Sequence, residues 1–380
     1  MARQIAPTSF DAALAALSGA AAGHQSVRIV GGATKLGWGR PEDAPEVEIR
    51  TAALDRIVEH NAGDLTAVLE AGVPLARAQR QFASAGQMLA LDPFLGPSQE
   101  ATIGGIVSTA DAGPLRHRYG APRDLILGIT VALSDGTIAR AGGKVIKNVA
   151  GYDLGKLFCG SFGTLGLILA VSVRLHPLPV ATATALGVSD DPGTISRVAI
   201  TLSAAPLELE ALDVAWHNGR GGILAQCGGA QARRRAERVA RVMRKAGLGR
   251  VQIAGQDREL WARQRSGQRS ADGALVRVAA RPSALADVLR AADACSGTLV
   301  GRATIGHSFI DLDPEALGTL ANRLPRGAVP VLLDAPVEVR GAVDPWGPLP
   351  AAPALALMRN VKARFDPANA CNPGAFVGGI

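Results

Sequence analysis

A short β-branched segment, Ser26-Val27-Arg28-Ile29-Val30, runs directly into a glycine-rich loop that ends at Pro41. The segment is typical of a buried strand, and the loop begins with Gly31-Gly32-Ala33-Thr34-Lys35. Glycine has no Cβ, so such a loop can present bare main-chain amides to an anionic group. We therefore predict that residues 30–41 form a phosphate-cradling loop.

A second glycine-rich stretch extends from Gly96 to Pro179. The glycines in it that could approach a ligand with bare backbone are Gly104, Gly105, Gly113, Gly160, Gly163 and Gly166. A tight turn would explain any one of these glycines taken alone. Two such loops in one chain instead favour a site where the backbone lies against a large anionic cofactor.

The loops do not have the spacing of the common nucleotide-binding motifs. No G-x-G-x-x-G opens a helix after the first strand, and no Gly-Lys-Ser/Thr closes the loop. The sequence therefore disfavours both a dinucleotide-binding Rossmann fold and a P-loop ATPase.

Composition indicates a globular chain of two or three domains. The 380 residues are 48% hydrophobic and 19% charged, and the 45 glycines suit a loop-rich α/β architecture. Four cysteines lie far apart, so we expect neither a zinc site nor an iron–sulfur cluster in this chain and no metal site. Free thiols fit a reducing cytoplasm.

The amino-terminal region predicts a helix rather than a signal peptide. The apolar run 12–22 is short and follows a capping sequence, Thr8-Ser9-Phe10-Asp11. No stretch reaches the ~20 apolar residues of a membrane-spanning helix. We expect a cytoplasmic protein that would meet the inner face of the membrane only peripherally or through a partner.

The net charge of +7 raises the question of nucleic-acid binding. The densest basic run begins at Arg233 and ends at Lys245, with Ala236, Val239 and Met243 at helical spacing. This pattern favours an amphipathic helix with a solvated basic face, and a docking surface for an acidic partner is the alternative. Aromatic stacking platforms are missing nearby, so we expect no nucleic-acid partner.

The order of patterns predicts an α+β (α/β) chain. We expect a first domain over residues 1–179, with lobes at about 1–93 and 96–179, and a different strand-and-helix pattern over 180–329. Asp135-Gly136 between β-rich runs predicts a tight hairpin in the second lobe. The remaining segment, 330–380, contains a helix and the turn Asn372-Pro373-Gly374.

Taken together, these motifs resemble the FAD-binding domain of the vanillyl-alcohol oxidase and p-cresol methylhydroxylase (PCMH) superfamily. Within it, the chain is most similar to the FAD-binding subunits of bacterial glycolate oxidases. The residues that carry the resemblance are the loop 30–41, Ala101-Thr102-Ile103-Gly104-Gly105, Arg123-Asp124, Asn148-Val149-Ala150-Gly151-Tyr152-Asp153-Leu154, residues 160–166 and Asn372-Pro373-Gly374.

The resemblance implies a two-lobed PCMH-type domain that binds FAD, a cap domain over 180–329, and a tail over 330–380 that packs back on the FAD domain. Covalent attachment often uses a histidine in the first loop, and none lies between Val30 and Pro41, so we expect noncovalent FAD. The expected cofactor-binding residues are Val30, Gly31, Gly32, Ala33, Thr34, Lys35, Leu36, Gly37, Pro97, Thr102, Gly104, Gly105, Ser108, Thr109, Gly113, Arg116, Gly160, Gly163, Gly166 and Ile168.

Residues for catalysis are harder to find. Oxidation of a 2-hydroxy acid needs a base, a cation for the carboxylate and a hydride acceptor, which flavin supplies. Catalytic relatives use a His-x-His metal site, but no two of the six histidines are two positions apart, and Phe162 stands where relatives often have glutamate. His307 is a weak candidate base; His117 is either a flavin-side residue or a solvated one.

The resemblance implies a subunit of a glycolate oxidase or dehydrogenase complex that oxidises glycolate, a small 2-hydroxy acid, to glyoxylate. Its expected partners are a catalytic FAD-containing subunit and an iron–sulfur subunit that accepts electrons. Two alternatives stay open at this point: a self-sufficient FAD-dependent dehydrogenase of another small hydroxy acid or alcohol, and a non-catalytic assembly subunit.

Overall fold

The structure is a computed structural model that describes residues 2–40, 44–144, 153–266 and 272–380. The chain forms two compact units. Unit 1 comprises Met1–Ala112, Gly120–Leu178 and Pro348–Ile380, and unit 2 comprises Gly113–Tyr119 and Pro179–Gly347. The mixed α+β class expected from the sequence is confirmed.

Unit 1 begins with a small parallel sheet of order β1-β3-β2. Helix α1 packs its Ala13 and Leu17 against this sheet, and Ser9 caps the helix by accepting a hydrogen bond from the N–H of Ala12. The first lobe contains β1 (Arg3–Ile5), α1 (Phe10–Ala22), β2 (Val27–Val30), β3 (Val47–Arg50), β4 (Ile57–Asn61), β5 (Thr66–Glu70), α2 (Leu75–Ser84) and β6 (Gln87–Met88).

A second sheet in unit 1 has the order β4-β5-β9-β7-β8 and is antiparallel throughout. Strands β7 and β8 form the hairpin predicted at Asp135-Gly136, and their register pairs Ala132 with Ile138. The elements of this part are α3 (Ile103–Thr109), α5 (Pro122–Leu125), β7 (Ile126–Ala132), β8 (Ile138–Gly142), α6 (Leu154–Phe158), β9 (Leu167–Arg174) and β10 (His176–Pro177).

The carboxyl-terminal segment belongs to unit 1. After helix α13 (Ala352–Phe365), Cys371 forms a parallel bridge with Val27 of β2, and the N–H of Asn372 donates to the carbonyl of Val27. The buried Lys362 of α13 donates to the carbonyls of Thr164 and Cys371. These bonds tie the tail to the edge of the first sheet.

Unit 2 is built on one eight-stranded sheet of order β14-β11-β13-β12-β16-β17-β15-β18, in which all neighbours are antiparallel. Its elements are α4 (Arg116–Tyr119), β11 (Thr182–Ser189), α7 (Pro192–Ala204), β12 (Leu209–His217), β13 (Arg220–Gly228), α8 (Ala232–Lys245), β14 (Arg250–Ala254), α9 (Arg258–Ser266), β15 (Ala274–Ala279), α10 (Leu285–Asp293), β16 (Thr298–Arg302), β17 (His307–Leu312), α11 (Leu317–Arg323), β18 (Val329–Asp334) and α12 (Val337–Ala342).

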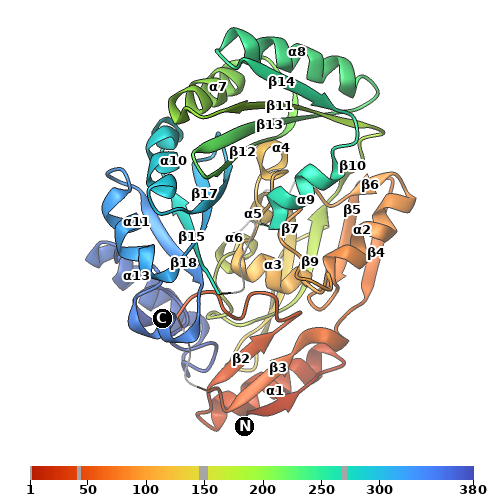
Figure 1. The fold of residues 1–380 in the computed structure, drawn as a ribbon. Coiled ribbons are helices and arrows are strands. Elements are labelled where there is room, and N and C mark those ends of the chain that lie inside the picture. The colour runs from red at the N-terminus through yellow and green to blue at the C-terminus, as the bar shows by residue number, and fades with distance from the viewer. Residues whose placement is uncertain (1, 41–43, 145–152, 267–271) are drawn as a thin grey trace. The chain divides into compact units, whose positions relative to one another are not determined.

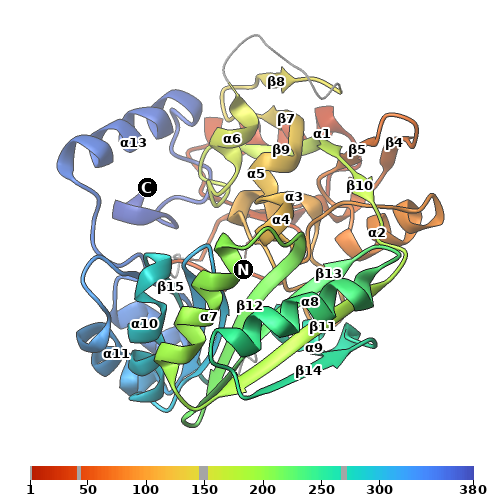
Figure 2. The same ribbon diagram turned by 90° about the horizontal axis from the view of Figure 1, so that it is seen from above.

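The two faces of this sheet differ in chemistry. Helices α7, α8 and α10 cover one face, as Figures 1 and 2 show, and Leu212, Val214 and Ile310 point into that apolar core. Because side chains alternate along a strand, Asp213 and His307 point to the opposite face. There α9 packs its Trp261 against Ala211 and Leu224 of β12 and β13.

The division into units differs from the domain boundaries expected from the sequence at two places. Residues 330–347 fall in unit 2 because β18 pairs with β15 and the N–H of Leu332 donates to the carbonyl of Pro345. Residues 113–119 also fall in unit 2, because α4 is bonded to β12 there. No local sequence pattern indicates that either segment belongs to unit 2.

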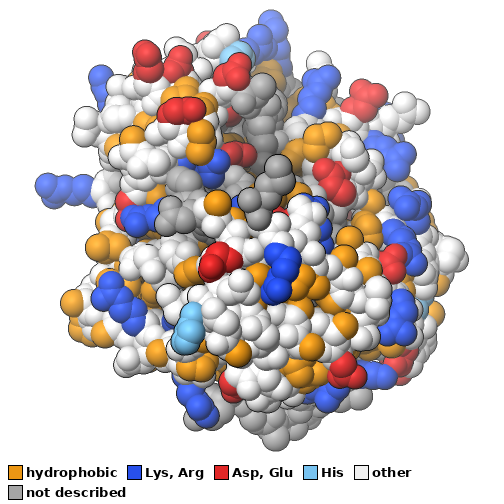
Figure 3. All heavy atoms as spheres, turned by 90° about the horizontal axis from the view of Figure 1, so that it is seen from below, with side chains coloured by type: hydrophobic (Ala, Val, Ile, Leu, Met, Phe, Trp, Pro, Cys, Tyr) orange, Lys and Arg blue, Asp and Glu red, His pale blue; other side chains and the backbone are white. Residues whose placement is uncertain are grey.

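The described part of the chain contains no helix that is both long and apolar enough to cross a membrane. On the face drawn in Figure 3, Lys and Arg side chains are interspersed with Asp and Glu side chains.

Candidate cofactor and substrate sites

A cavity of about 50 Å³ lies within unit 1 where the glycine loops meet. Its lining combines the end of β2, the start of α3, the turn before β9 and the carboxyl-terminal tail. The lining residues are Ile29, Gly31, Thr51, Ala71, Gly104, Gly105, Ser108, Phe162, Gly163, Gly166, Ile168 and Asn372.

Glycine is required at two of the lining positions. A Cβ on Gly31 would lie 2.2 Å from Oγ1 of Thr102, which caps α3 by accepting from the N–H of Gly105. Gly163 has φ of +73°, and a Cβ there would lie 2.9 Å from Nδ2 of Asn372. The loops are thus packed at distances that exclude side chains, which leaves their main-chain groups facing the cavity.

Asn372 closes the cavity by joining two segments far apart in sequence. Its Oδ1 accepts a hydrogen bond from the N–H of Ile29 at 3.0 Å, and its Nδ2 donates to the carbonyl of Phe162 at 2.7 Å. The N–H of Phe162 in turn donates to the carbonyl of Ser108 at 2.8 Å. One tail residue therefore fixes both the strand and the turn that line the site.

The loop after β2 carries main-chain donors with no protein acceptor. Within the described residues, the N–H groups of Gly31, Gly32, Ala33 and Thr34 donate to no other part of the chain. Ala33 has φ of +57°, the left-handed conformation that turns successive N–H groups toward one concavity. This donor set fits the diphosphate of FAD, which a backbone loop can bind without a side-chain charge.

Several side chains predicted to bind the cofactor bond to other residues of the chain. Lys35 is 6% exposed, lies 3.3 Å from the carboxylate of Asp111 and donates to the carbonyl of Phe94. Asp111 therefore already balances its charge, which makes the backbone of this loop the main contact for an anion. Thr109 donates to the carbonyl of Gly105 within α3.

The structure brings together seven of the predicted cofactor residues around the cavity: Gly31, Gly104, Gly105, Ser108, Gly163, Gly166 and Ile168. Eleven others lie in unit 1 but outside the cavity lining: Val30, Gly32, Ala33, Thr34, Lys35, Leu36, Gly37, Pro97, Thr102, Thr109 and Gly160. Gly113 and Arg116 belong to unit 2, because the segment that carries them bonds to β12 and β17.

Sequence reasoning missed some lining residues. Thr51 and Ala71 follow β3 and β5, and nothing in their local sequence indicates a site. Phe162 and Asn372 lie inside motifs that carry the family resemblance, which was the available signal. Asn148 and Tyr152 lie outside the described residues, and Asp153 caps α6 by accepting from the N–H of Lys156.

A second polar cluster lies on the α9-bearing face of the sheet in unit 2. Arg302 and His307 are direct neighbours on β16 and β17, and Arg302 forms an ion pair with Asp213 on β12. Arg116 of α4 lies 3.2 Å from Nδ1 of His307. The cluster thus combines two guanidinium groups with one imidazole on a single face.

His307 is neutral at physiological pH. Burial lowers its pKa to about 4, and Arg116, Arg277 and Arg302 add to the effect. Because a guanidinium can only donate, Nδ1 of His307 accepts and Nε2 carries the hydrogen. In this tautomer the ring offers a donor toward an anion rather than a basic nitrogen.

Helix α4 is fastened to β12 by one buried carboxylate. Glu210 accepts from the hydroxyl of Tyr119 at 2.7 Å and from Arg118 at 3.1 Å. Burial raises the pKa of Tyr119, and the bond to Glu210 raises it further. His117 in the same helix lies 3.0 Å from the hydroxyl of Thr304, so it takes part in the packing of unit 2.

No group of three or more His, Cys, Asp or Glu side chains that could hold a metal ion occurs among the residues the structure describes.

The comparisons with known proteins agree with the cavity in unit 1. Residues 2–142 match the FAD binding domain family, and residues 345–376 match the C-terminal domain of FAD linked oxidases. The first match covers the amino-terminal part of the chain, and the second covers a short carboxyl-terminal segment. The cavity draws lining residues from both matched segments, since Asn372 lies in the second.

Curated relatives match over about two fifths of this chain. Glycolate oxidase subunit GlcE of Escherichia coli is 38% identical over 156 residues, 40% of this chain and 43% of that protein. Glycolate oxidase subunit GlcD of Bacillus subtilis is 36% identical over 163 residues, which are 42% of this chain and 34% of that protein. The mitochondrial D-lactate dehydrogenase (cytochrome) 1 of Saccharomyces cerevisiae is 31% identical over 161 residues, which are 42% of this chain and 27% of that protein. These matches span less than half the length of each relative.

Similarity of fold extends over nearly the whole chain. An alkyldihydroxyacetonephosphate synthase structure covers 97% of this chain and 76% of its own, with a TM-score of 0.72 at 14% identity. At that identity the likeness establishes the fold alone.

Proposed function

We propose that this chain is the FAD-binding subunit of an oxidoreductase complex that oxidises glycolate to glyoxylate. The observation that carries the proposal is the cavity in unit 1, which the FAD-binding segment builds and Asn372 of the oxidase-type tail closes. The names of the curated relatives supply the substrate class, because they include glycolate oxidase subunits and a D-lactate dehydrogenase.

Different residues of the chain would have different roles in this function. The open N–H groups of Gly31 to Thr34 would bind the FAD diphosphate, and Gly104, Ser108 and Gly163 would line one side of the cofactor. FAD, when bound noncovalently, supplies the acceptor for the hydride of the hydroxy acid. Separately, the cluster in unit 2 that combines Arg116, His307 and the Asp213-paired Arg302 carries donors of the kind that bind carboxylates.

A base for the hydroxyl proton is not apparent in this cluster. His307, the weak candidate from the sequence, has its Nδ1 occupied by Arg116 and a pKa near 4, so it would remove a proton poorly at neutral pH. This favours a subunit that depends on a catalytic flavoprotein partner and passes electrons to an iron–sulfur partner. We place the complex in the cytoplasm, at most peripherally on the inner face of the membrane.

An anaerobic reduction experiment separates this proposal from a self-sufficient dehydrogenase. The purified chain is loaded with FAD, glycolate is added without oxygen, and the flavin absorbance is followed. The proposal predicts that glycolate leaves the flavin oxidised in the isolated chain, whereas dithionite bleaches it. Bleaching by glycolate alone, or by D-lactate under the same conditions, would identify the chain as an independent dehydrogenase and overturn the assignment.

A further inference from the structure

Helix α8 of unit 2 carries seven cationic side chains, and they fall into two groups by what they bond. Arg233 pairs with Glu237, Arg235 pairs with Glu208, and Arg244 donates to the carbonyl of Val251. The other four form no ion pair within the described residues: Arg234, Arg238, Arg241 and Lys245.

The four unpaired cations form one continuous stripe. They follow one another at helical spacings of four, three and four residues, and all are exposed. At 1.5 Å per residue the stripe extends about 16 Å along the helix. It lies opposite the buried side of α8, where Ala236, Ala240 and Met243 pack on the sheet.

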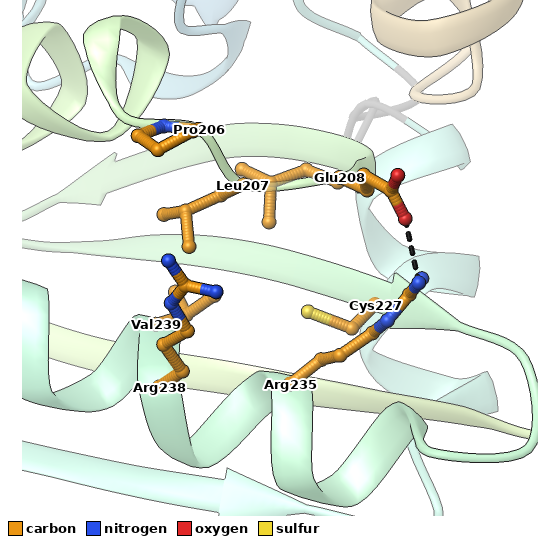
Figure 4. A pocket seen from close by; sticks show the side chains of 8 residues that line it. Pro206, Leu207, Glu208, Cys227, Arg235, Arg238 and Val239 are labelled. Carbon is orange, nitrogen blue, oxygen red and sulfur yellow. Dashed lines mark hydrogen bonds and ion pairs between the residues drawn. The ribbon is translucent and has the colours of Figure 1, made fainter.

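A cavity of about 290 Å³ opens beside this stripe, between α8 and the connection from α7 to β12. Leu207, Leu209 and Val239 form apolar walls, and the buried Cys227 of β13 lies among them. Figure 4 shows Leu207 and the Arg238 guanidinium pointing toward each other, with the Glu208–Arg235 ion pair on the other side. Arg238 therefore belongs both to the stripe and to the cavity.

The aliphatic walls of the cavity suit an aliphatic side chain. An apolar anchor in a pocket beside complementary charges is the usual composition of a protein interface. We propose that α8 docks an acidic helical segment of a partner protein, whose carboxylates face the stripe and whose aliphatic side chain enters the cavity. The site is independent of the cofactor cavity in unit 1 and of the proposed reaction.

The chemistry of the cavity favours a protein over a nucleic acid. The cavity walls are aliphatic and offer no aromatic surface on which a base could stack.

The test uses the full chain and a labelled, alanine-based helical peptide of about 18 residues. The peptide carries four glutamates at the spacing of the stripe and one leucine beside the second glutamate. Binding is measured by fluorescence anisotropy for the unaltered chain, for the double variant Arg238→Glu/Arg241→Glu, and for the matched control Arg233→Glu. Circular dichroism and thermal melting check that each variant is folded.

We expect the double variant to weaken binding about tenfold or more, and the control by less than about twofold. Replacing the peptide's leucine with serine should weaken binding to the unaltered chain by about fivefold or more. Equal losses in the double variant and the control would show unspecific charge attraction and overturn the proposal. Absence of binding to the acidic peptide, or tighter binding of a single-stranded oligonucleotide that the double variant abolishes, would overturn it as well.

Discussion

The side chain of Asn372 joins two segments that line the cofactor cavity. Replacing it with alanine leaves the N–H of Ile29 and the carbonyl of Phe162 without their partner. Because an unsatisfied buried group costs about 1–3 kcal/mol, we expect Asn372→Ala to lower the free energy of unfolding by about 2 kcal/mol and to weaken FAD binding about tenfold. Urea unfolding and a flavin titration measure the two effects.

A nearby exposed asparagine gives the control for this prediction. Asn369 has φ of +51° and its side chain forms no bond to the cavity, so Asn369→Gly should change neither quantity appreciably. Equal FAD affinity in Asn372→Ala and the unaltered chain would show that the tail does not organise the site.

Gly31 tests the close packing of the loop. In Gly31→Ala the new Cβ would lie 2.2 Å from Oγ1 of Thr102, so the start of α3 must shift. We expect a loss of about 1–3 kcal/mol in stability and a clear loss of FAD binding. Gly19→Ala in α1 is the matched control: its Cβ meets nothing within 4 Å, and it should stabilise the chain by about 0.5–1 kcal/mol. Unchanged FAD affinity in Gly31→Ala would contradict the proposal that the backbone at Gly31 lies against the cofactor.

His307 gives unit 2 a pH-dependent stability with a defined sign. Its pKa is about 4 in the folded chain and near 6.5 when unfolded, so between these values the unfolded state binds more protons. Stability contributed by the neutral ring is therefore complete above about pH 6.5 and is lost as pH falls toward 4. We expect His307→Gln to reduce the stability difference between pH 7 and pH 5 by roughly 1–2 kcal/mol, measured by urea unfolding. The exposed His24→Gln serves as control, and an unchanged difference in His307→Gln would rule out the assigned protonation.

At the scale of elements, the end of α13 carries a buried ion pair, and its Lys362 also donates to the carbonyl of Thr164. Lys362 and Asp366 are 8% and 0% exposed, and Lys362 lowers the pKa of Asp366 although burial alone would raise it. Lys362→Met leaves that carboxylate buried without its partner, so we expect a loss of about 3–5 kcal/mol. The exposed pair Lys156–Asp153 is the comparison, and Lys156→Met should cost at most about 0.5 kcal/mol. Similar melting temperatures for the two variants would contradict the predicted cost of breaking the buried pair.

The elements also show which features a sequence can predict. Asp135-Gly136 predicted the β7–β8 hairpin because turn residues are encoded locally. The apolar residues at helical spacing between Arg233 and Lys245 predicted α8, again from a local pattern. In contrast, the placement of α4 in unit 2 depends on Glu210, which follows it by about ninety residues and has no partner that a local pattern could reveal.

At the scale of the whole chain, the glycine loops predicted the cofactor class, while the cavity depends on contacts between distant segments. Gly31, Gly104 and Gly163 come together only because the sheets of unit 1 fold, and Asn372 reaches them through the returning tail. Thr51 and Ala71 complete the lining from positions with no local signal. Glycines in the sequence indicate loops whose backbone can bind a cofactor. The contacts that complete the cavity join distant segments, so no local sequence pattern predicts them.

The flavin content of the purified chain tests the central claim most directly. The chain alone is incubated with excess FAD, passed through a desalting column, and denatured with acid, and flavin is measured separately in the supernatant and the pellet. The account predicts about one FAD per chain, all of it in the supernatant, and much less for Asn372→Ala. Flavin that stays with the pellet would contradict noncovalent binding, and a chain without flavin after this incubation would contradict the cofactor site itself.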